Sequence, residues 1–271
     1  MLSPFITSLA NIIENNMVIS HTHRYLFIEI PLTGSWALRN ELCNLYDGTP
    51  ILHKHATYPE FRKIATSDEL KYFVFGTVRN PLDVVVSRYF KLKNDHKGIF
   101  SRTGSVNSLE ADYSDLLKHE FVQRTDVDFV TFFRKYHQRP FGDLIDVESS
   151  RYNKVIYYER LQDEFSAILN HLGIAAQRVV PFTNRTEGKA SNWDSYYTTE
   201  VREQAVRVFA PFMHKWGYDF PSSWGEAKTA WRSQIEYLLV TYLRNLYYCN
   251  FRYSNSTTAQ LVRKMRAQII D

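Results

Sequence analysis

The sequence has few of the residues that mark disulfide-rich, fibrous or disordered chains. Its 271 residues include two cysteines, ten glycines and nine prolines. Cys43 and Cys249 lie far apart and without the spacing of metal ligands, which argues against a disulfide framework or a zinc site and favours two reduced thiols. A hydrophobic content of 44% is typical of a globular protein that can bury a full core.

The sequence also shows no segment with the pattern of a membrane anchor. Residues 1–20 contain Glu14 and no basic region, unlike a signal peptide. The apolar stretch from Ile235 to Phe251 is interrupted by Glu236 and Arg244 and is too short to span a bilayer. We therefore expect a cytoplasmic protein.

The charge balance is modestly positive. The formal net charge is +4 and the sequence pI is near 8.9. Such a balance favours anionic partners such as nucleotides, acidic sugars or a membrane surface, and does not by itself indicate nucleic acid. We expect no nucleic-acid partner.

Two segments have the pattern strand, loop, helix. In the first, the apolar run Tyr25 to Ile30 precedes the loop Pro31 to Ser35 and a helical pattern from Ala37 to Leu45. In the second, the hydrophobic run Tyr72 to Val78 predicts a strand covered on both faces.

The second unit also carries helix-start signals. Asn80 is a suitable N-cap and Pro81 suits the first helical position, so we expect a helix that runs to about Lys93.

The other expected elements continue this alternation. They are an extended segment at 51–58, a brief helix at 59–65, a mobile loop at 94–108, helices at 109–121 and 126–136, a strand at 154–158, a helix at 161–172 ended by Gly173, a helix from about 199, and two further helices broken at 254–256. Alternating strands and helices predict an α/β fold with a parallel sheet flanked by helices. We expect one domain over 1–222 and a C-terminal helical extension over 223–271.

Candidate anion-binding residues follow both strands. Thr33, Gly34, Ser35 and Trp36 lie at the start of the first helix, where exposed N–H groups attract phosphate. Taken alone, that loop is better interpreted as an ordinary strand-to-helix turn. Arg79 follows the second strand, and Ser87 lies about two helical turns later, so one element offers a guanidinium and a hydroxyl to a phosphate.

These segments resemble the sulfotransferase family. TVRNPLDVVVSRYF looks like the segment that binds the 3′-phosphate of the donor, and IEIPLTGSWAL looks like the 5′-phosphosulfate loop. KHATYPEFRK between them, followed by VIYYERL, NRTEGKASNWDSYYTTEVRE and WGYDF, matches the order of segments in the bacterial and carbohydrate sulfotransferases. The resemblance covers roughly residues 24 to 221.

The resemblance implies a P-loop-NTPase-like fold and 3′-phosphoadenosine 5′-phosphosulfate as donor, without a metal. The roles it implies are the 5′ end of the donor for Thr33, Gly34, Ser35 and Trp36, the 3′-phosphate for Arg79 and Ser87, and closure over the nucleotide for the loop with Arg185 and Lys189.

Transfer to a hydroxyl needs a base, and His53 and His55 are the candidates because neutral imidazole accepts a proton near pH 7. Their spacing would place both rings on one face of an extended segment. The pair resembles the paired histidines of heparan 2-O-sulfotransferases. We therefore expect His55 as base with His53 in support, and a carbohydrate or related acceptor.

The chain departs from the family at Leu32, where a lysine normally neutralises charge on the bridging oxygen. Loss of one such contact lowers the rate about a hundredfold to a thousandfold. Lys54, Arg88 and Lys189 are candidate substitutes. A catalytically weak or inactive nucleotide-binding homologue is the alternative. A small-molecule kinase ranks lower, because the sequence has no GxxxxGK[ST].

The C-terminal segment carries an apolar stripe with helical spacing of three and four. It comprises Trp231, Ile235, Leu238, Leu239, Tyr242, Leu246 and Cys249. Most such stripes pack on their own domain. Because the tail is also basic, a homodimer contact or a peripheral membrane contact is the alternative.

Overall fold

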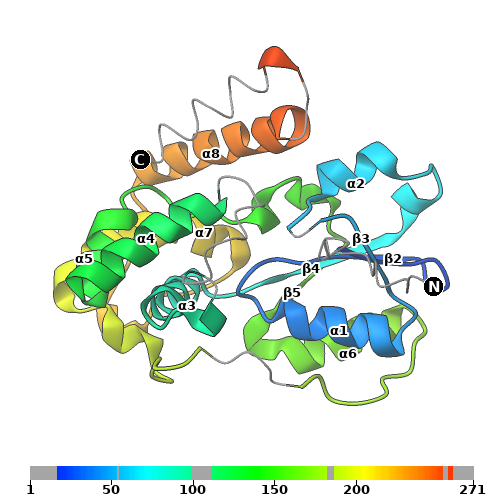
Figure 1. Cartoon of the computed structure of the whole chain (residues 1–271), viewed down its shortest axis with the longest axis horizontal. Helices are drawn as coiled ribbons and strands as arrows, with labels where there is room; N and C mark the ends of the chain where they lie inside the picture. The colour runs from blue at the N-terminus through cyan, green and yellow to red at the C-terminus, as the bar shows by residue number, and fades with distance from the viewer. Residues whose placement is uncertain are drawn as a thin grey trace, which may run out of the picture.

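A five-stranded sheet forms the centre of the computed structural model, which describes residues 17–53, 55–98, 100, 111–181, 186–252 and 256–258 (Figure 1). The strand order is β3-β1-β2-β4-β5. The strands are β1 (Met17–Ser20), β2 (Tyr25–Ile28), β3 (Thr49–Ile51), β4 (Phe73–Val78) and β5 (Lys154–Tyr157).

Four of the five strands run in the same direction, so their carboxyl ends lie at one edge of the sheet. β2 pairs in parallel with β4, and β4 with β5, whereas β1 is antiparallel to both β2 and β3. β3 therefore runs in the same direction as β2, β4 and β5, and β1 alone runs against them. In an open α/β sheet, the edge at the carboxyl ends is where ligands bind.

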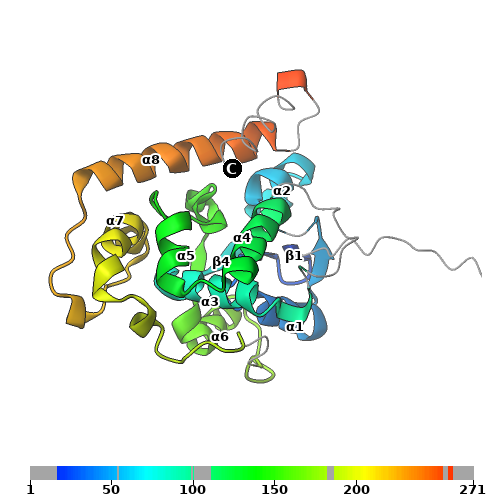
Figure 2. The same ribbon diagram turned by 60° about the vertical axis from the view of Figure 1, so that its left-hand side comes forward.

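The helices enclose this sheet from both sides (Figures 1 and 2). They are α1 (Ser35–Leu45), α2 (Tyr58–Ile64), α3 (Pro81–Lys93), α4 (Ala111–Thr125), α5 (Phe129–Tyr136), α6 (Leu161–His171), α7 (Thr199–Trp216) and α8 (Trp231–Leu246). The predicted α/β class is confirmed.

The two faces of the sheet follow from the period-two alternation of strand side chains. In β2, Tyr25 and Phe27 pack into the core under α1 and α6, whereas Leu26 and Ile28 pack into the opposite core with side chains of α2, α7 and α8. A third cluster joins α3 to α4, α5 and α7 beside the sheet. The side chains of β2 are thus buried on both faces of the sheet.

Several predicted elements are confirmed at their boundaries. α3 begins at Pro81 and ends at Lys93, and the side chain of Asn80 accepts a hydrogen bond from the Leu82 N–H. Gly173, which follows α6, has a φ of 72°, as expected for a residue that ends a helix in the left-handed conformation.

Other predictions are wrong or lie outside the described residues. Of the predicted extended segment 51–58, only Ile51 is in a strand, because a turn follows it and α2 already begins at Tyr58. β1 was missed, because four buried residues show no alternation that could identify a strand. Most of the loop 94–108 and the break at 254–256 lie outside the described residues.

A buried carboxylate attaches the C-terminal helix to the domain. Oδ1 of Asp146, whose side chain is fully buried, accepts hydrogen bonds from Lys215 Nζ at 2.8 Å, from Trp216 Nε1 at 3.1 Å and from Tyr237 Oη of α8 at 2.9 Å. A buried charge needs such donors to offset its lost hydration. Asp146 therefore fixes α8 against α7.

The predicted apolar stripe does not pack on the domain. The described face of α8 that is buried carries Ser233 and Tyr237, whereas Leu238 and Leu239 are more than half exposed. The boundary at 222 stays a prediction. Among the described residues, no helix combines the length and apolar character needed to cross a bilayer.

We predict that Asp146→Ala lowers the free energy of unfolding by about 3 kcal/mol, because the buried Tyr237 hydroxyl, the partly buried Trp216 indole and the Lys215 ammonium lose their common acceptor. Urea denaturation measures the change. Glu203→Ala, an exposed carboxylate on α7, is the control and should change stability by less than about 0.5 kcal/mol. Equal effects of the two substitutions would contradict the anchoring role of Asp146.

Candidate active site

Side chains from four strand ends meet at one edge of the sheet. The loop with Gly34 follows β2, His53 follows β3, Arg79 follows β4, and Glu159 follows β5. The parallel direction of these strands places all four segments at the carboxyl edge. This edge is therefore the candidate active site.

The loop after β2 turns at Gly34 into the start of α1. Gly34, the N-cap of α1, has a φ of 75°, and an added Cβ would lie 2.9 Å from Cδ2 of Tyr158. The hydroxyls of Thr33 and Ser35 both donate to the Ile30 carbonyl, at 2.6 and 2.5 Å. Gly34 is therefore required both because its φ is positive and because a larger residue would clash with Tyr158.

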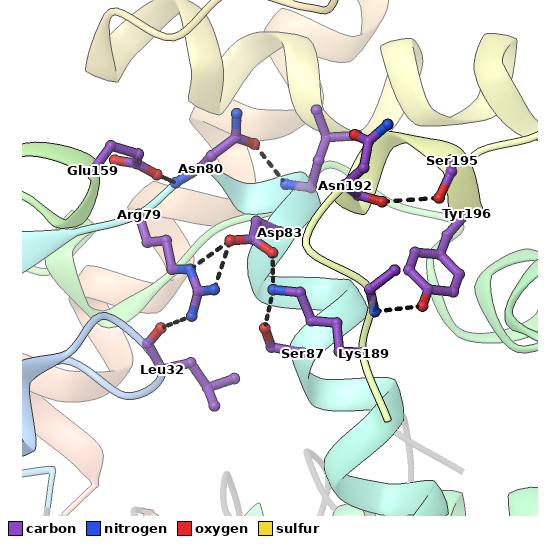
Figure 3. A network of polar contacts seen from close by, with 12 residues as sticks. Leu32, Arg79, Asn80, Asp83, Ser87, Glu159, Lys189, Asn192, Ser195 and Tyr196 are labelled. Atoms are coloured by element: carbon purple, nitrogen blue, oxygen red, sulfur yellow. Dashed lines mark hydrogen bonds and ion pairs between the residues drawn. The ribbon is translucent and has the colours of Figure 1, made fainter. Parts of the chain in front are cut away.

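Arg79 connects the loop to the first turn of α3 (Figure 3). Its Nε and Nη2 donate to Oδ2 of Asp83 at 2.9 and 2.5 Å, and its Nη1 donates to the Leu32 carbonyl at 2.9 Å. The guanidinium carbon lies 4.2 Å from the ring centroid of Tyr158. These contacts hold the guanidinium plane in one orientation.

Lys189 completes a cluster of charged groups around Asp83. Its ammonium contacts Oδ1 of Asp83 and donates to Ser87 Oγ at 3.1 Å. Burial lowers the pKa of Lys189, and the contact with Asp83 opposes that shift. Two cations and one carboxylate, Arg79, Lys189 and Asp83, carry one net positive charge.

Glu159 holds the start of α3 from the neighbouring strand. Its Oε1 accepts from the Asn80 N–H at 2.9 Å and its Oε2 accepts from Tyr218 Oη at 2.9 Å. Burial raises the pKa of Tyr218, so its hydroxyl stays a donor. Glu159 therefore orients the segment that carries Arg79 rather than pairing with Arg160, whose guanidinium contacts Glu164.

The two histidines lie in a turn rather than on one face of an extended segment. Leu52 and His55 have φ values of 55° and 61°, and the Ala56 N–H donates to the His53 carbonyl at 3.1 Å. The expectation of a shared face is therefore wrong. His53 Nε2 lies 2.6 Å from Oε1 of Glu60.

Glu60 is itself fixed by the start of α2. Its Oε2 accepts from the N–H and the hydroxyl of Thr57, at 2.7 and 3.0 Å. Glu60 was not among the predicted site residues, although Thr57 and Glu60 have the spacing of a capping box. That motif identifies a fixed carboxylate but does not show which histidine it meets.

The structure brings Arg79, Ser87 and Lys189 together, with the Leu32 carbonyl beside them. Trp36 is 44% exposed at the start of α1. Arg88, a candidate substitute for the loop lysine, contacts Asp115 of α4 at 3.0 Å. Arg185 and Lys54 lie outside the described residues.

Asp83 was also missed. Its signal was the i,i+4 spacing from Arg79 in the first turn of a helix, where carboxylates are favoured.

A small, partly open pocket adjoins the loop. It is lined by Gly34, Ala37, Tyr158, Leu161, Gln162, Val180 and Pro181. Gln162 fixes the far wall through two hydrogen bonds to the backbone of Val180, at 2.8 and 3.0 Å.

We predict that Gly34→Ala destabilises the protein by about 3 kcal/mol, because the methyl group must displace the Tyr158 ring and φ is positive. Gly173→Ala is the matched control: its φ is 72° and nothing lies within 4 Å of an added Cβ, so it should cost about 1 kcal/mol. Thermal unfolding measures both. Equal losses would show that Tyr158 does not restrict the loop.

Comparison with known proteins places these features in a family. No significant match was found among curated proteins or among solved structures. The family model described as "Sulfotransferase family" matches residues 15–253, a span that includes the loop after β2, the start of α3 and both histidines. The chain therefore belongs to the sulfotransferase family.

Proposed function

We propose that this protein transfers a sulfuryl group from 3′-phosphoadenosine 5′-phosphosulfate to a hydroxyl of a carbohydrate or related acceptor. The observation that carries the proposal is the cluster of Arg79, Lys189 and Ser87 around the Asp83 carboxylate at the carboxyl edge of the sheet. Arg79 and Lys189 both contact the Asp83 carboxylate, and the Ser87 hydroxyl lies beside the Lys189 ammonium. Guanidinium, ammonium and hydroxyl groups placed together are the donors that a phosphate needs.

The residues present fit such a donor. Asp83 now accepts the hydrogen bonds of Arg79 and Lys189 that a 3′-phosphate would compete for, and Ser87 adds a hydroxyl. Gly34 lets the Tyr158 ring pack against the loop after β2, because a larger residue would clash with that ring. The donor itself supplies the activated sulfuryl group.

The chain's own part in the reaction is proton removal and positioning. As the acceptor oxygen forms its bond to sulfur and the bond to the bridging phosphate oxygen breaks, the acceptor proton passes to a base. We assign this role to His55, with His53 as a positioning residue. His53 suits that role because Glu60, held by Thr57, fixes its ring.

Leu32 leaves the reaction without the family's loop lysine. Its φ is 65°, a strained value for leucine, and its side chain points away from the Arg79 guanidinium (Figure 3). Its carbonyl accepts from Arg79 Nη1, so a cation still contacts the loop. We propose that Arg79 and Lys189 supply part of the missing charge.

The second candidate function is nucleotide binding without efficient transfer. Leu32 favours it, because the groups that we propose for phosphate binding are present whereas the family's usual cation for the bridging oxygen is replaced. A small-molecule kinase stays the third candidate. Stabilisation by ATP and magnesium, but not by adenosine 3′,5′-bisphosphate, would favour that function.

We predict that adenosine 3′,5′-bisphosphate at about a hundred times its Kd stabilises the protein by roughly 2.7 kcal/mol. Thermal shift would detect this as several degrees. Arg79→Ala should remove most of the shift, because the phosphate loses its bidentate partner. Arg160→Ala should retain it, since Arg160 also precedes a helix and pairs i,i+4 with a carboxylate but is 62% exposed. Loss of the shift in both variants would argue against a phosphate site at Arg79.

We predict that Leu32→Lys raises transfer of labelled sulfuryl to a glycan panel about a hundredfold, because it restores charge at the bridging oxygen. Leu32→Met, which changes shape without adding charge, should leave the rate unchanged. His55→Ala should abolish transfer in both backgrounds without loss of nucleotide binding. If neither the wild type nor Leu32→Lys transfers the label while both bind the bisphosphate, the nucleotide-binding module is the better description.

A further inference from the structure

α8 exposes its apolar side to solvent along its whole length. Seven large apolar side chains on this side are between 36% and 67% exposed: Trp231, Ile235, Leu238, Leu239, Tyr242, Leu243 and Leu246. Both views place α8 at the periphery of the molecule (Figures 1 and 2). We call this set of seven side chains the α8 face.

The opposite side of α8 uses polar groups to contact the domain. Tyr237 donates to Asp146, Asn245 Oδ1 accepts from the Glu148 N–H at 2.7 Å, and Arg244 lies 3.7 Å from Asp146 Oδ2. A helix on the surface of a monomer usually has the reverse arrangement, with its apolar stripe against the core. These polar contacts fix the orientation of α8, so the α8 face is held outward.

Six of the seven side chains of the α8 face are spaced symmetrically about one point, and only Leu243 has a polar counterpart, Gln234. Trp231 and Leu246, Ile235 and Tyr242, and Leu238 and Leu239 are three pairs that lie at equal sequence distances from the point between Leu238 and Leu239. In an antiparallel pair of identical helices, a two-fold axis at that point places each member of a pair opposite its counterpart. A self-complementary surface of this kind is what an isologous interface requires.

We propose that the α8 face is the interface of a homodimer in which α8 packs antiparallel against α8 of a second copy. The area agrees with this occupant. Seven side chains of roughly 200 Å² each, about half exposed, leave on the order of 700 Å² of apolar surface. A stable interface buries about 800 Å² per partner.

The charges beside the α8 face favour a second copy over a membrane. Arg232 and Glu236 are both exposed on α8, and their opposite charges cancel. Arg244 is turned toward Asp146. Helices that lie on anionic bilayers carry a strongly basic polar side in contact with the headgroups, whereas the polar side of α8 is occupied by the domain.

The test is the mass of the full-length protein in solution, measured by light scattering after gel filtration and by sedimentation equilibrium. The wild type should have twice the chain mass of 31.9 kDa. Leu239→Glu should raise the Kd of the dimer at least about 100-fold, because the two-fold axis places the two introduced carboxylates close together. Leu239 is 56% exposed, so its substitution should leave the fold intact, which thermal unfolding checks.

Ile64→Glu is the matched control. Ile64 ends α2 and is 62% exposed, yet lies outside the α8 face, so this variant should remain a dimer. An equimolar mixture of Leu239→Glu and Leu239→Lys should restore the dimer, because opposite charges then meet at the axis. Restoration would show contact across the axis rather than local unfolding.

Three results would overturn the proposal. One is a wild type that remains monomeric at about 100 µM, above the Kd of most stable dimers. Another is a dimer whose Kd is unchanged by Leu239→Glu. The third is a monomeric wild type that sediments with phosphatidylcholine–phosphatidylserine vesicles and loses that binding in Leu239→Glu, which would identify a membrane as the occupant.

Discussion

The ion pair between Arg79 and Asp83 is the contact on which the candidate active site depends. Through it, the first turn of α3 fixes the guanidinium that contacts the Leu32 carbonyl and the Tyr158 ring. The same carboxylate contacts Lys189. Because these groups are buried, their mutual attraction is screened little by solvent. An arriving phosphate would have to take over donors that are already placed, which limits the ordering that binding requires.

The direction of the strands explains why these groups meet. β2, β3, β4 and β5 all end at one edge, although β1 lies between β2 and β3 and runs against them. The antiparallel β1 therefore adds width to the sheet without moving the histidine segment to the opposite edge. It separates the histidine segment from the loop after β2 by one strand.

The two sides of α8 have different surroundings: one contacts the domain and the other faces solvent. Its polar side is fixed by Asp146 and neighbouring backbone groups, so the apolar side cannot turn inward. The apolar stripe predicted from the sequence does lie on one side of α8. It faces solvent because the buried Asp146 carboxylate needs hydrogen-bond donors, which come from the other side of the helix. The carboxylate that attaches α8 to the domain thus also determines which side of α8 faces solvent.

The sequence by itself determined the α/β class and the boundaries of α3, because hydrophobic runs and caps are local signals. It also predicted Arg79, Ser87 and Lys189 as site residues from family motifs, and the structure places these three side chains together. Only the tertiary structure decided that Asp83 lies between Arg79 and Lys189, that Glu60 meets His53, and that β1 runs against its neighbours. It also decided which way α8 faces. These outcomes depend on contacts between segments far apart in the chain, and no local pattern encodes the partner of a charged side chain.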